Sequence, residues 1–322
     1  MTQLKKRFPV IVGPTASGKS ALAVSLARHL HGEIVSADSM QIYEGLTVGT
    51  AAPTEQERGG IPHHLIGFLP LDAAYSVAQY AADARRVIAE VFARENLPIL
   101  CGGTGLYVQA VVENIEFSET KAPEGLRESL RQRAQTEGGA ALLNELQTID
   151  PDTAARLHEN DLGRIVRALE VYHTTGKTIS EHARLSKLTP SPYDPCVIFL
   201  DFRDRERLYQ RIHDRVDEMM KKGLLDEARS LLSGPTPPTA IQAIGYKELR
   251  PYLQGEVSLD EALDELKKST RHYAKRQLSW FRRMPDTHIL YVDDYSDLTE
   301  LTEAAVSVWR TTEFLMEKEE NA

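Results

Sequence analysis

The sequence has little cysteine and no long apolar run. Its 322 residues include two cysteines, Cys101 and Cys196, without Cys-x-x-Cys spacing or a neighbouring histidine cluster. These features exclude a disulfide framework and a zinc module, and we expect both thiols in the core. No segment approaches the roughly 20 apolar residues that span a bilayer. The polar start Met1–Arg7 leads directly into a strand, so we expect no signal peptide, no membrane contact and a cytoplasmic location.

An excess of positive charge is also missing, because the formal net charge is −9. That value argues weakly against a nucleic-acid partner, yet basic residues are concentrated in one segment. Residues 267–283 hold no acidic residue and interleave aromatic side chains with Lys267, Lys268, Arg271, Lys275, Arg276, Arg282 and Arg283. This pattern indicates a surface for a phosphate backbone. A helix paired with nearby acids such as those in 260–265 remains the alternative.

The strongest motif in the chain is a phosphate-binding loop. The pattern G-x-x-x-x-G-K-[ST] is matched at every fixed position by Gly13, Pro14, Thr15, Ala16, Ser17, Gly18, Lys19 and Ser20. A strand-like run, 8–12, precedes it and a helix-like run, 21–27, follows. Backbone N–H groups and the helix dipole of such a loop bind anions. Lys19 would reach a terminal phosphate, and the Ser20 hydroxyl would ligate Mg²⁺.

Strands and helices alternate along the chain, which predicts an α/β fold with a parallel sheet covered on both faces, like that of P-loop NTPases. We expect strands at 8–12, 33–38, 98–101 and 196–202, and an edge strand at 288–292. Ligands bind beyond the carboxyl ends of parallel strands. The phosphate loop, Asp38 and the turn 102–104 all follow strand ends, so we expect them to meet at one crevice.

A segment without strand signals interrupts this alternation. We expect helices at 123–137, 140–148 and 161–175, which predicts a helical insertion at 119–190 between core segments 1–118 and 191–322. A later helix from 208 to 223 carries Arg211 and Arg215 on one face. The basic segment lies on a long helix between a capping box at 258–261 and Pro285.

The phosphate loop alone leaves several activities open. A nucleotide kinase, an NTPase and a transferase with a phosphorylated donor all use such a loop. A regulatory GTPase is disfavoured because no Asn-Lys-x-Asp motif occurs, and a helicase would need a longer chain. Small-molecule kinases remain possible.

Several further blocks narrow this choice. These blocks are 13–20, 38–43, 49–51, 62–64, 102–107, 164 with 167–171, 244–248 and 275–277 with 280–282. Taken together and in this order, they resemble the bacterial tRNA dimethylallyltransferase (IPP transferase) family, and the resemblance extends from about residue 8 to 293. The resemblance implies transfer of a dimethylallyl group from dimethylallyl diphosphate to N6 of adenosine 37, in tRNAs that read codons starting with U. The phosphate loop would then hold a diphosphate leaving group with Mg²⁺. We expect a monomer that binds the tRNA anticodon stem-loop.

The resemblance also implies roles for individual residues. Asp38 would be the base that takes a proton from N6, or a group that orients this amine by a hydrogen bond. Thr104 would lie near that amine, Arg215 would hold the diphosphate, and His63 would lie near the donor. The helical insertion would clamp the anticodon loop. The residues implied to contact tRNA are Asp38, Ser39, Met40, Gln41, Thr104, Leu162, Gly163, Arg164, Ile165, Val166, Gln242, Gly245, Tyr246, Lys247 and Arg276.

The sequence departs from the family pattern at three positions. Relatives usually carry a basic residue where Glu44 and Ala52 stand, and commonly proline at Glu159.

Two alternative functions from other classes predict different behaviour. A nucleoside or nucleotide kinase would consume ATP without tRNA, and a non-catalytic RNA-binding protein would bind without turnover.

Overall fold

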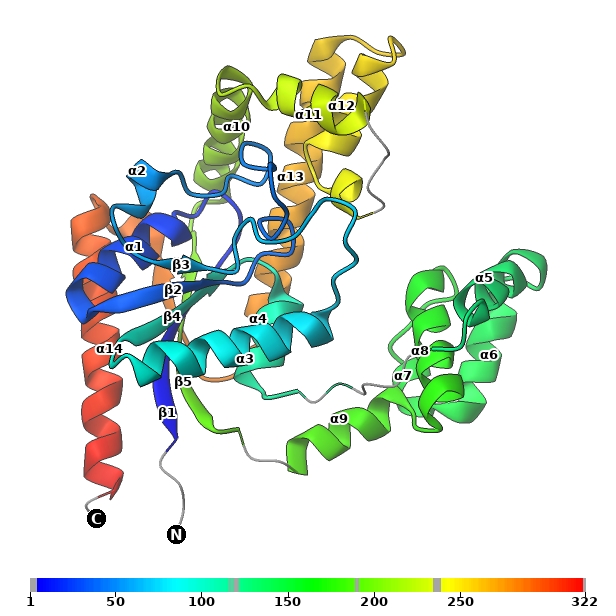
Figure 1. Cartoon of the computed structure of the whole chain (residues 1–322), viewed down its shortest axis with the longest axis horizontal. Coiled ribbons are helices and arrows are strands. Elements are labelled where there is room, and N and C mark those ends of the chain that lie inside the picture. Colours follow the sequence, from blue (N-terminus) through cyan, green and yellow to red (C-terminus); the bar gives the residue numbers. More distant parts are fainter. Residues whose placement is uncertain (1–4, 116, 118–121, 189–190, 234–238, 321–322) are drawn as a thin grey trace. The chain divides into compact units, whose positions relative to one another are not determined.

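The computed structural model describes all residues except 1–4, 116, 118–121, 189–190, 234–238 and 321–322. The chain divides into two compact units (Figure 1), a core of Met1–Val112 with Pro192–Ala322 and a helical unit of Glu113–Ser191. The boundaries predicted at 118–119 and at 190 fall on residues outside this description.

The core is built on one six-stranded sheet in which every neighbouring pair is parallel. Its strand order is β3-β2-β4-β1-β5-β6, with bounds β1 Lys6–Val12, β2 Gly32–Ser36, β3 His63–His64, β4 Leu97–Gly102, β5 Tyr193–Asp201 and β6 Thr287–Tyr291. The predicted parallel sheet and the edge position of the last strand are confirmed. The two-residue strand β3 was missed because so short a segment carries no periodic signal.

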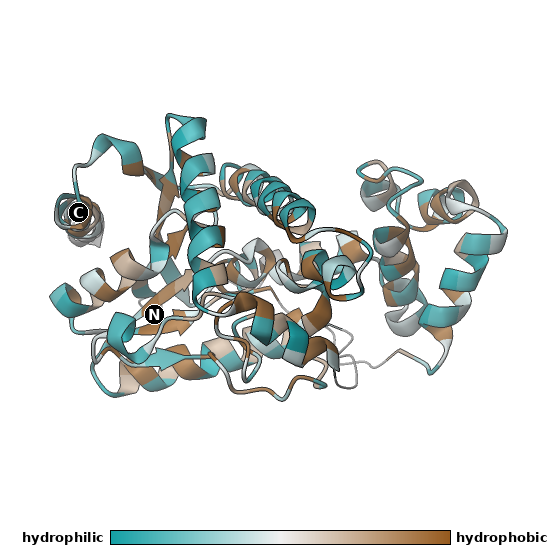
Figure 2. Ribbon diagram, turned by 90° about the horizontal axis from the view of Figure 1, so that it is seen from above, coloured by the Kyte–Doolittle hydropathy of each residue, from teal (hydrophilic) through white to brown (hydrophobic). Residues whose placement is uncertain are grey.

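Helices cover both faces of the sheet, as expected for a parallel sheet. Alternate side chains of β1 point to opposite faces: Phe8, Val10 and Val12 join one buried cluster, whereas Ile11 joins the other. Both cysteines are buried, as expected. Figure 2 shows apolar residues gathered in the central strands, while the helices carry both apolar and polar residues. The core helices are α1 Lys19–Leu30, α2 Glu55–Arg58, α3 Val77–Ala93, α4 Gly105–Val112, α10 Arg205–Lys221, α11 Leu224–Ser233, α12 Tyr246–Leu253, α13 Leu259–Phe281 and α14 Leu298–Glu320.

Helices α10 to α13 form a layer with a core of its own beyond the carboxyl ends of the strands (Figure 1). Val216, Leu224, Leu249 and Leu266, one from each helix, are buried together with Tyr43 from the loop after β2. Short 3₁₀ turns occur at η1 Ala240–Gln242 and η2 Val292–Asp294. This layer closes the crevice that the sheet leaves open.

The second unit is entirely helical where it is described. Its helices are α5 Leu126–Thr136, α6 Gly139–Ile149, α7 Pro151–Ala154, α8 Leu162–Thr175 and α9 Ile179–Leu188. The three helices expected from the sequence coincide with α5, α6 and α8. A buried carboxylate, Glu170, accepts hydrogen bonds from Arg127 and Arg167. Burial alone would raise the pKa of Glu170, but the two guanidinium groups outweigh it and lower the pKa, so this ion pair holds α5 against α8.

Candidate functional site

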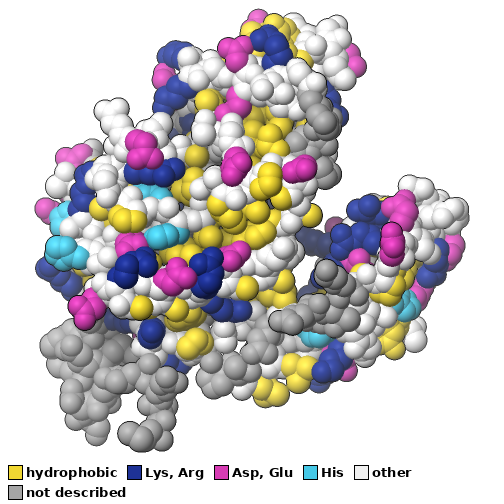
Figure 3. All heavy atoms as spheres, in the orientation of Figure 1, with side chains coloured by type: hydrophobic (Ala, Val, Ile, Leu, Met, Phe, Trp, Pro, Cys, Tyr) yellow, Lys and Arg dark blue, Asp and Glu magenta, His cyan; other side chains and the backbone are white. Residues whose placement is uncertain are grey.

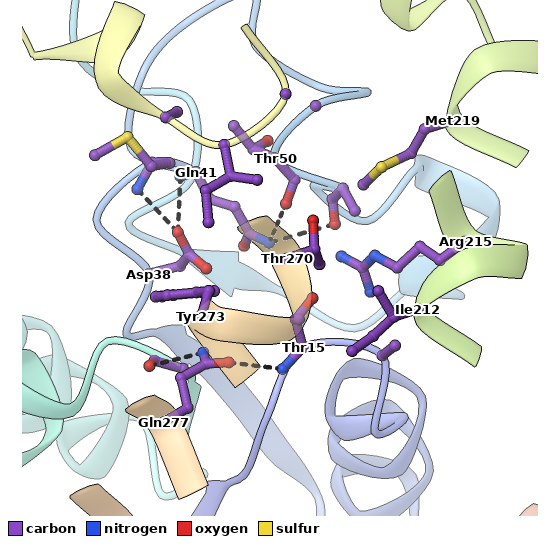
Figure 4. Close-up of a pocket in the computed structure, with 18 of the residues that line it drawn as sticks. Thr15, Asp38, Gln41, Thr50, Ile212, Arg215, Met219, Thr270, Tyr273 and Gln277 are labelled. Atoms are coloured by element: carbon purple, nitrogen blue, oxygen red, sulfur yellow. Dashed lines mark hydrogen bonds between the residues drawn. The ribbon is translucent and has the colours of Figure 1, made fainter. Parts of the chain in front are cut away.

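One cavity of about 390 Å³ lies inside the core unit. It is lined by the phosphate loop, the segments after β2 and β4, and helices α10, α12 and α13. Figure 4 shows side chains from these segments converging on it. The prediction that the phosphate loop, Asp38 and the turn after β4 share one crevice therefore agrees with the geometry.

The phosphate loop has the backbone geometry of an anion cradle. Gly18 precedes α1 with φ of 91°, a conformation that side chains disfavour, and this turn directs the loop into the helix N-terminus. The Ser17 side chain is buried, and its hydroxyl has no hydrogen-bond partner in the described structure. A buried hydroxyl without a partner costs free energy, so this loop is suited to an anion that would accept a hydrogen bond from the hydroxyl.

Lys19 is the first cation of the cavity. Its Nζ donates to the Pro14 carbonyl at 2.7 Å across the loop. Burial, the largest cause, and the Arg215 guanidinium lower the pKa of Lys19 to about 8, although Cys101 and Asp38 act in the opposite direction. The amine is therefore mostly charged at pH 7 but is close to losing its proton.

Arg215 is the second cation. It projects from α10 toward the phosphate loop (Figure 4). Burial lowers its pKa from the usual value, and no described residue forms a hydrogen bond or an ion pair with it. Arg211, one turn earlier, instead donates to the Ala16 carbonyl at 2.8 Å and supports the loop. The cavity thus contains a poorly solvated guanidinium that an anionic ligand would stabilise.

Asp38 lies on the opposite side of the cavity and is half-buried. Its Oδ1 accepts from Met40 N at 2.8 Å and from Gln41 N at 3.3 Å, and no described residue donates to its Oδ2. Thr104 Oγ1 accepts from the neighbouring Ser39 N at 3.0 Å. The carboxylate is therefore fixed through one oxygen and has the other available for a ligand.

A second carboxylate holds the loop that lines the cavity next to Asp38. Glu227 on α11 accepts from the backbone N–H groups of 47–49 at 2.7–2.9 Å and from the Tyr246 hydroxyl at 2.8 Å. The carbonyls of Thr50 and Ala51 in turn accept from Gln41 Nε2. Helices α11 and α12 thereby position the loop beside Asp38.

Helix α13 closes the cavity with Thr270, Tyr273, Arg276 and Gln277. The Arg276 guanidinium lies over the Tyr273 ring at 5.7 Å. Burial raises the pKa of Tyr273, so this phenol stays neutral. Tyr273 and Gln277 had no predicted site role, although their i, i+4 spacing places both on the helix face that also carries Thr270.

The basic segment of α13 is only partly available for RNA. Ion pairs join Lys267 to Asp217 at 2.7 Å, Lys268 to Glu265 at 3.0 Å and Arg282 to Asp201 at 2.8 Å, as the alternative interpretation expected for a paired helix. Figure 3 shows Lys and Arg side chains interspersed with Asp and Glu on the visible face of the core unit. Of the predicted basic surface, Arg276 lines the cavity.

Most predicted site residues are brought together. The cavity lining includes 15–20, 38–41, Arg215, Gln242, Gly245, Lys247 and Arg276. Thr104 lies just behind this lining, where it contacts Ser39. Gly13 and Pro14 are buried at the base of the loop. In the helical unit, Leu162, Gly163 and Arg164 are exposed at the start of α8.

Four predicted ligand-contacting residues are placed elsewhere. His63 lies on edge strand β3 with Nδ1 2.8 Å from the Ile61 carbonyl, and it is not part of the cavity lining. Tyr246 is fully buried and bonded to Glu227. Ile165 and Val166 are buried in the core of the helical unit. In the sequence, Ile165 and Val166 stand next to exposed polar residues, and only packing decides which of these side chains face inward.

Comparison with known proteins adds independent information. The family described as IPP transferase matches residues 41–284. The chain belongs to the IPP transferase family. Its relatives include the tRNA dimethylallyltransferase of Thermoanaerobacter sp. (strain X514), 47% identical over 91% of this chain and 94% of the relative. That of Carboxydothermus hydrogenoformans is 44% identical over 97% of this chain and 100% of the relative.

Solved structures of IPP transferases share this fold. The tRNA isopentenylpyrophosphate transferase of Bacillus halodurans has a TM-score of 0.71 at 39% identity, over 98% of this chain and 100% of that one. A eukaryotic dimethylallyltransferase acting on tRNA has a TM-score of 0.81 at 30% identity, over 97% of this chain and 80% of that one. In this IPP transferase, no helix among the described residues is long and apolar enough to cross a membrane.

Proposed function

We propose that this protein transfers the dimethylallyl group of dimethylallyl diphosphate to N6 of adenosine 37, in tRNAs that read codons starting with U. The observation that carries the proposal is the shared cavity in which the phosphate loop and Arg215 face Asp38. The two cations would bind a diphosphate, and the carboxylate, which is held in place, would accept a hydrogen bond from an amine. The kinase interpretation is disfavoured, because the relatives with 44–47% identity are dimethylallyltransferases.

The cavity supports the following chemistry. Cleavage of the allylic C–O bond leaves its electron pair on the diphosphate, where the loop N–H groups, Lys19 and Arg215 stabilise the charge. The N6 lone pair forms the new bond to the allylic carbon. The amine then loses one proton, which Asp38 Oδ2 accepts, while Thr104 and Ser39 hold the carboxylate segment in place.

Mg²⁺ fits this arrangement as a companion of the diphosphate. No group of three or more His, Cys, Asp or Glu side chains in the described chain could hold a metal alone. Ser20, at the mouth of the cradle, would supply a hydroxyl ligand, and diphosphate oxygens and water would supply the rest. When bound, the ion would neutralise charge on the leaving group.

The tRNA anticodon stem-loop is the expected macromolecular substrate. A base in a single-stranded loop can be extruded into a pocket at small cost. Gln242, Lys247 and Arg276 line the cavity and would contact the extruded nucleotide or its neighbours. We propose that the helical unit contributes through the exposed start of α8.

The test is incorporation of radiolabelled dimethylallyl group into unmodified tRNA with adenosine at positions 36 to 38, in the presence of Mg²⁺. We expect label in this tRNA and none in a matched tRNA with guanosine at position 37. Folded protein that leaves both unlabelled would contradict the proposal, and ATP-dependent phosphorylation of a nucleoside would favour the kinase.

The pKa of Lys19 predicts how diphosphate binding depends on pH. A group with a pKa of about 8 in the free protein is charged below that pH and loses its charge above it. We expect the affinity for inorganic pyrophosphate with Mg²⁺ to fall by up to about fivefold between pH 8 and pH 9, because the charged fraction of a group with this pKa falls by about that factor. Calorimetric titration across this range is the measurement. Lys19→Arg stays charged throughout and is the control; equal slopes for the two proteins would contradict the prediction.

A further inference from the structure

One buried amide connects the two sides of the cavity. Gln277 on α13 is 5% exposed, and its Oε1 accepts from Thr15 N at 2.8 Å. The Nε2 of the same side chain donates to the Gly103 carbonyl at 2.9 Å. Figure 4 shows both bonds. A single planar group therefore contacts the phosphate loop and the turn after β4.

These two partners belong to opposite halves of the proposed reaction. Thr15 lies in the loop that would hold the diphosphate. Gly103 precedes Thr104, whose hydroxyl accepts from Ser39 N next to Asp38. The side chain of Gln277 thus joins the segment that holds the donor to the segment that holds the acceptor.

The local geometry is specific for glutamine at this position. The bridge needs a donor and an acceptor on one rigid group, which a primary amide provides and a carboxylate or thioether does not. A Cβ on Gly103 would collide with Gln277 Nε2, so any other residue at this position would displace the amide group. The Gln277 side chain is buried, so the loss of a hydrogen-bond partner there would be costly.

We propose that Gln277 is a positioning residue that sets the distance between the donor carbon and the acceptor nitrogen, an inference that rests on the proposed transferase function. Transfer rates depend steeply on the separation and alignment of the reacting atoms. Both hydrogen-bonding atoms of Gln277 are directed at backbone groups. Its loss should therefore slow the chemical step without weakening the binding of either substrate.

The experiment compares Gln277→Glu and Gln277→Met with the wild type. The Gln277→Glu side chain would keep an acceptor for Thr15 N–H but would place an oxygen against the Gly103 carbonyl. The Gln277→Met side chain would lose both bonds at similar volume. Gln254→Glu, the same change at the exposed end of α12, is the matched control. We expect single-turnover transfer to tRNA to fall about 10-fold to 100-fold in both Gln277 variants and to stay unchanged in the control.

Binding and melting measurements separate positioning from other roles. Affinities for pyrophosphate with Mg²⁺ and for tRNA should stay within about threefold of wild type, with a cooperative thermal transition. Unchanged transfer rates would overturn the proposal. A matching loss of pyrophosphate or tRNA affinity would also overturn it, because Gln277 would then serve one site alone.

Folding defects and inactivity have separate consequences. Should Gln277→Glu lose its cooperative transition because of the buried charge, Gln277→Met decides the outcome. Loss of the transition in both variants would overturn the proposal in favour of a purely structural role. A folded wild type that transfers no label in the first place would contradict the proposed function itself.

Discussion

Asp38→Asn should lower the single-turnover rate of dimethylallyl transfer by about 10²-fold to 10⁴-fold. The asparagine can keep the Oδ1 acceptor for Met40 N and Gln41 N, so the loop after β2 should stay in place. At the Oδ2 position an amide NH₂ replaces the oxygen that would accept the N6 proton. The loss should therefore appear in the chemical step, with affinities for pyrophosphate and tRNA close to wild type.

Rapid quench of labelled tRNA measures this rate. Asp226→Asn is the matched control, because Asp226 is an exposed carboxylate on α11 that pairs with Arg229. A rate for Asp38→Asn within tenfold of wild type, at unchanged melting temperature, would show that proton removal does not depend on this carboxylate. A parallel loss of tRNA affinity would instead indicate a binding role.

Arg215→Gln should have the second large effect, about 10²-fold to 10³-fold on kcat/KM for dimethylallyl diphosphate. The guanidinium is poorly solvated and without a protein partner in the described structure, so a diphosphate gains a strong charge-assisted contact there. The contact strengthens as charge develops on the leaving group, so kcat should fall as well as affinity.

The same change at Arg207 is the control, since this exposed arginine lies on α10 outside the cavity lining. Arg215→Lys should recover part of the activity, because it restores charge but lacks the planar fork of arginine. Steady-state kinetics with varied donor at saturating tRNA gives both parameters. Normal donor kinetics in Arg215→Gln would place the diphosphate away from this side chain.

In the helical unit, the sequence predicted where the helices lie but not which of their residues are buried. The helices expected at 123–137, 140–148 and 161–175 match α5, α6 and α8. The sequence pattern could not tell which residues of α8 face inward. Ile165 and Val166 were expected at the RNA and lie in the core, while Leu162 and Arg164 are exposed.

The sequence by itself determined the parallel sheet, the phosphate loop and the family resemblance, because these features depend on short-range patterns: buried strand runs, a fixed glycine and lysine spacing, and contiguous motifs. The sequence also predicted that the phosphate loop, Asp38 and the turn after β4 share one crevice. Tertiary structure alone, however, decided the individual side-chain contacts between distant segments. It joined Gln277 to Thr15 and Gly103, and it paired Lys267 and Arg282 with acids. Such contacts depend on packing between elements far apart in the chain, which no local pattern records.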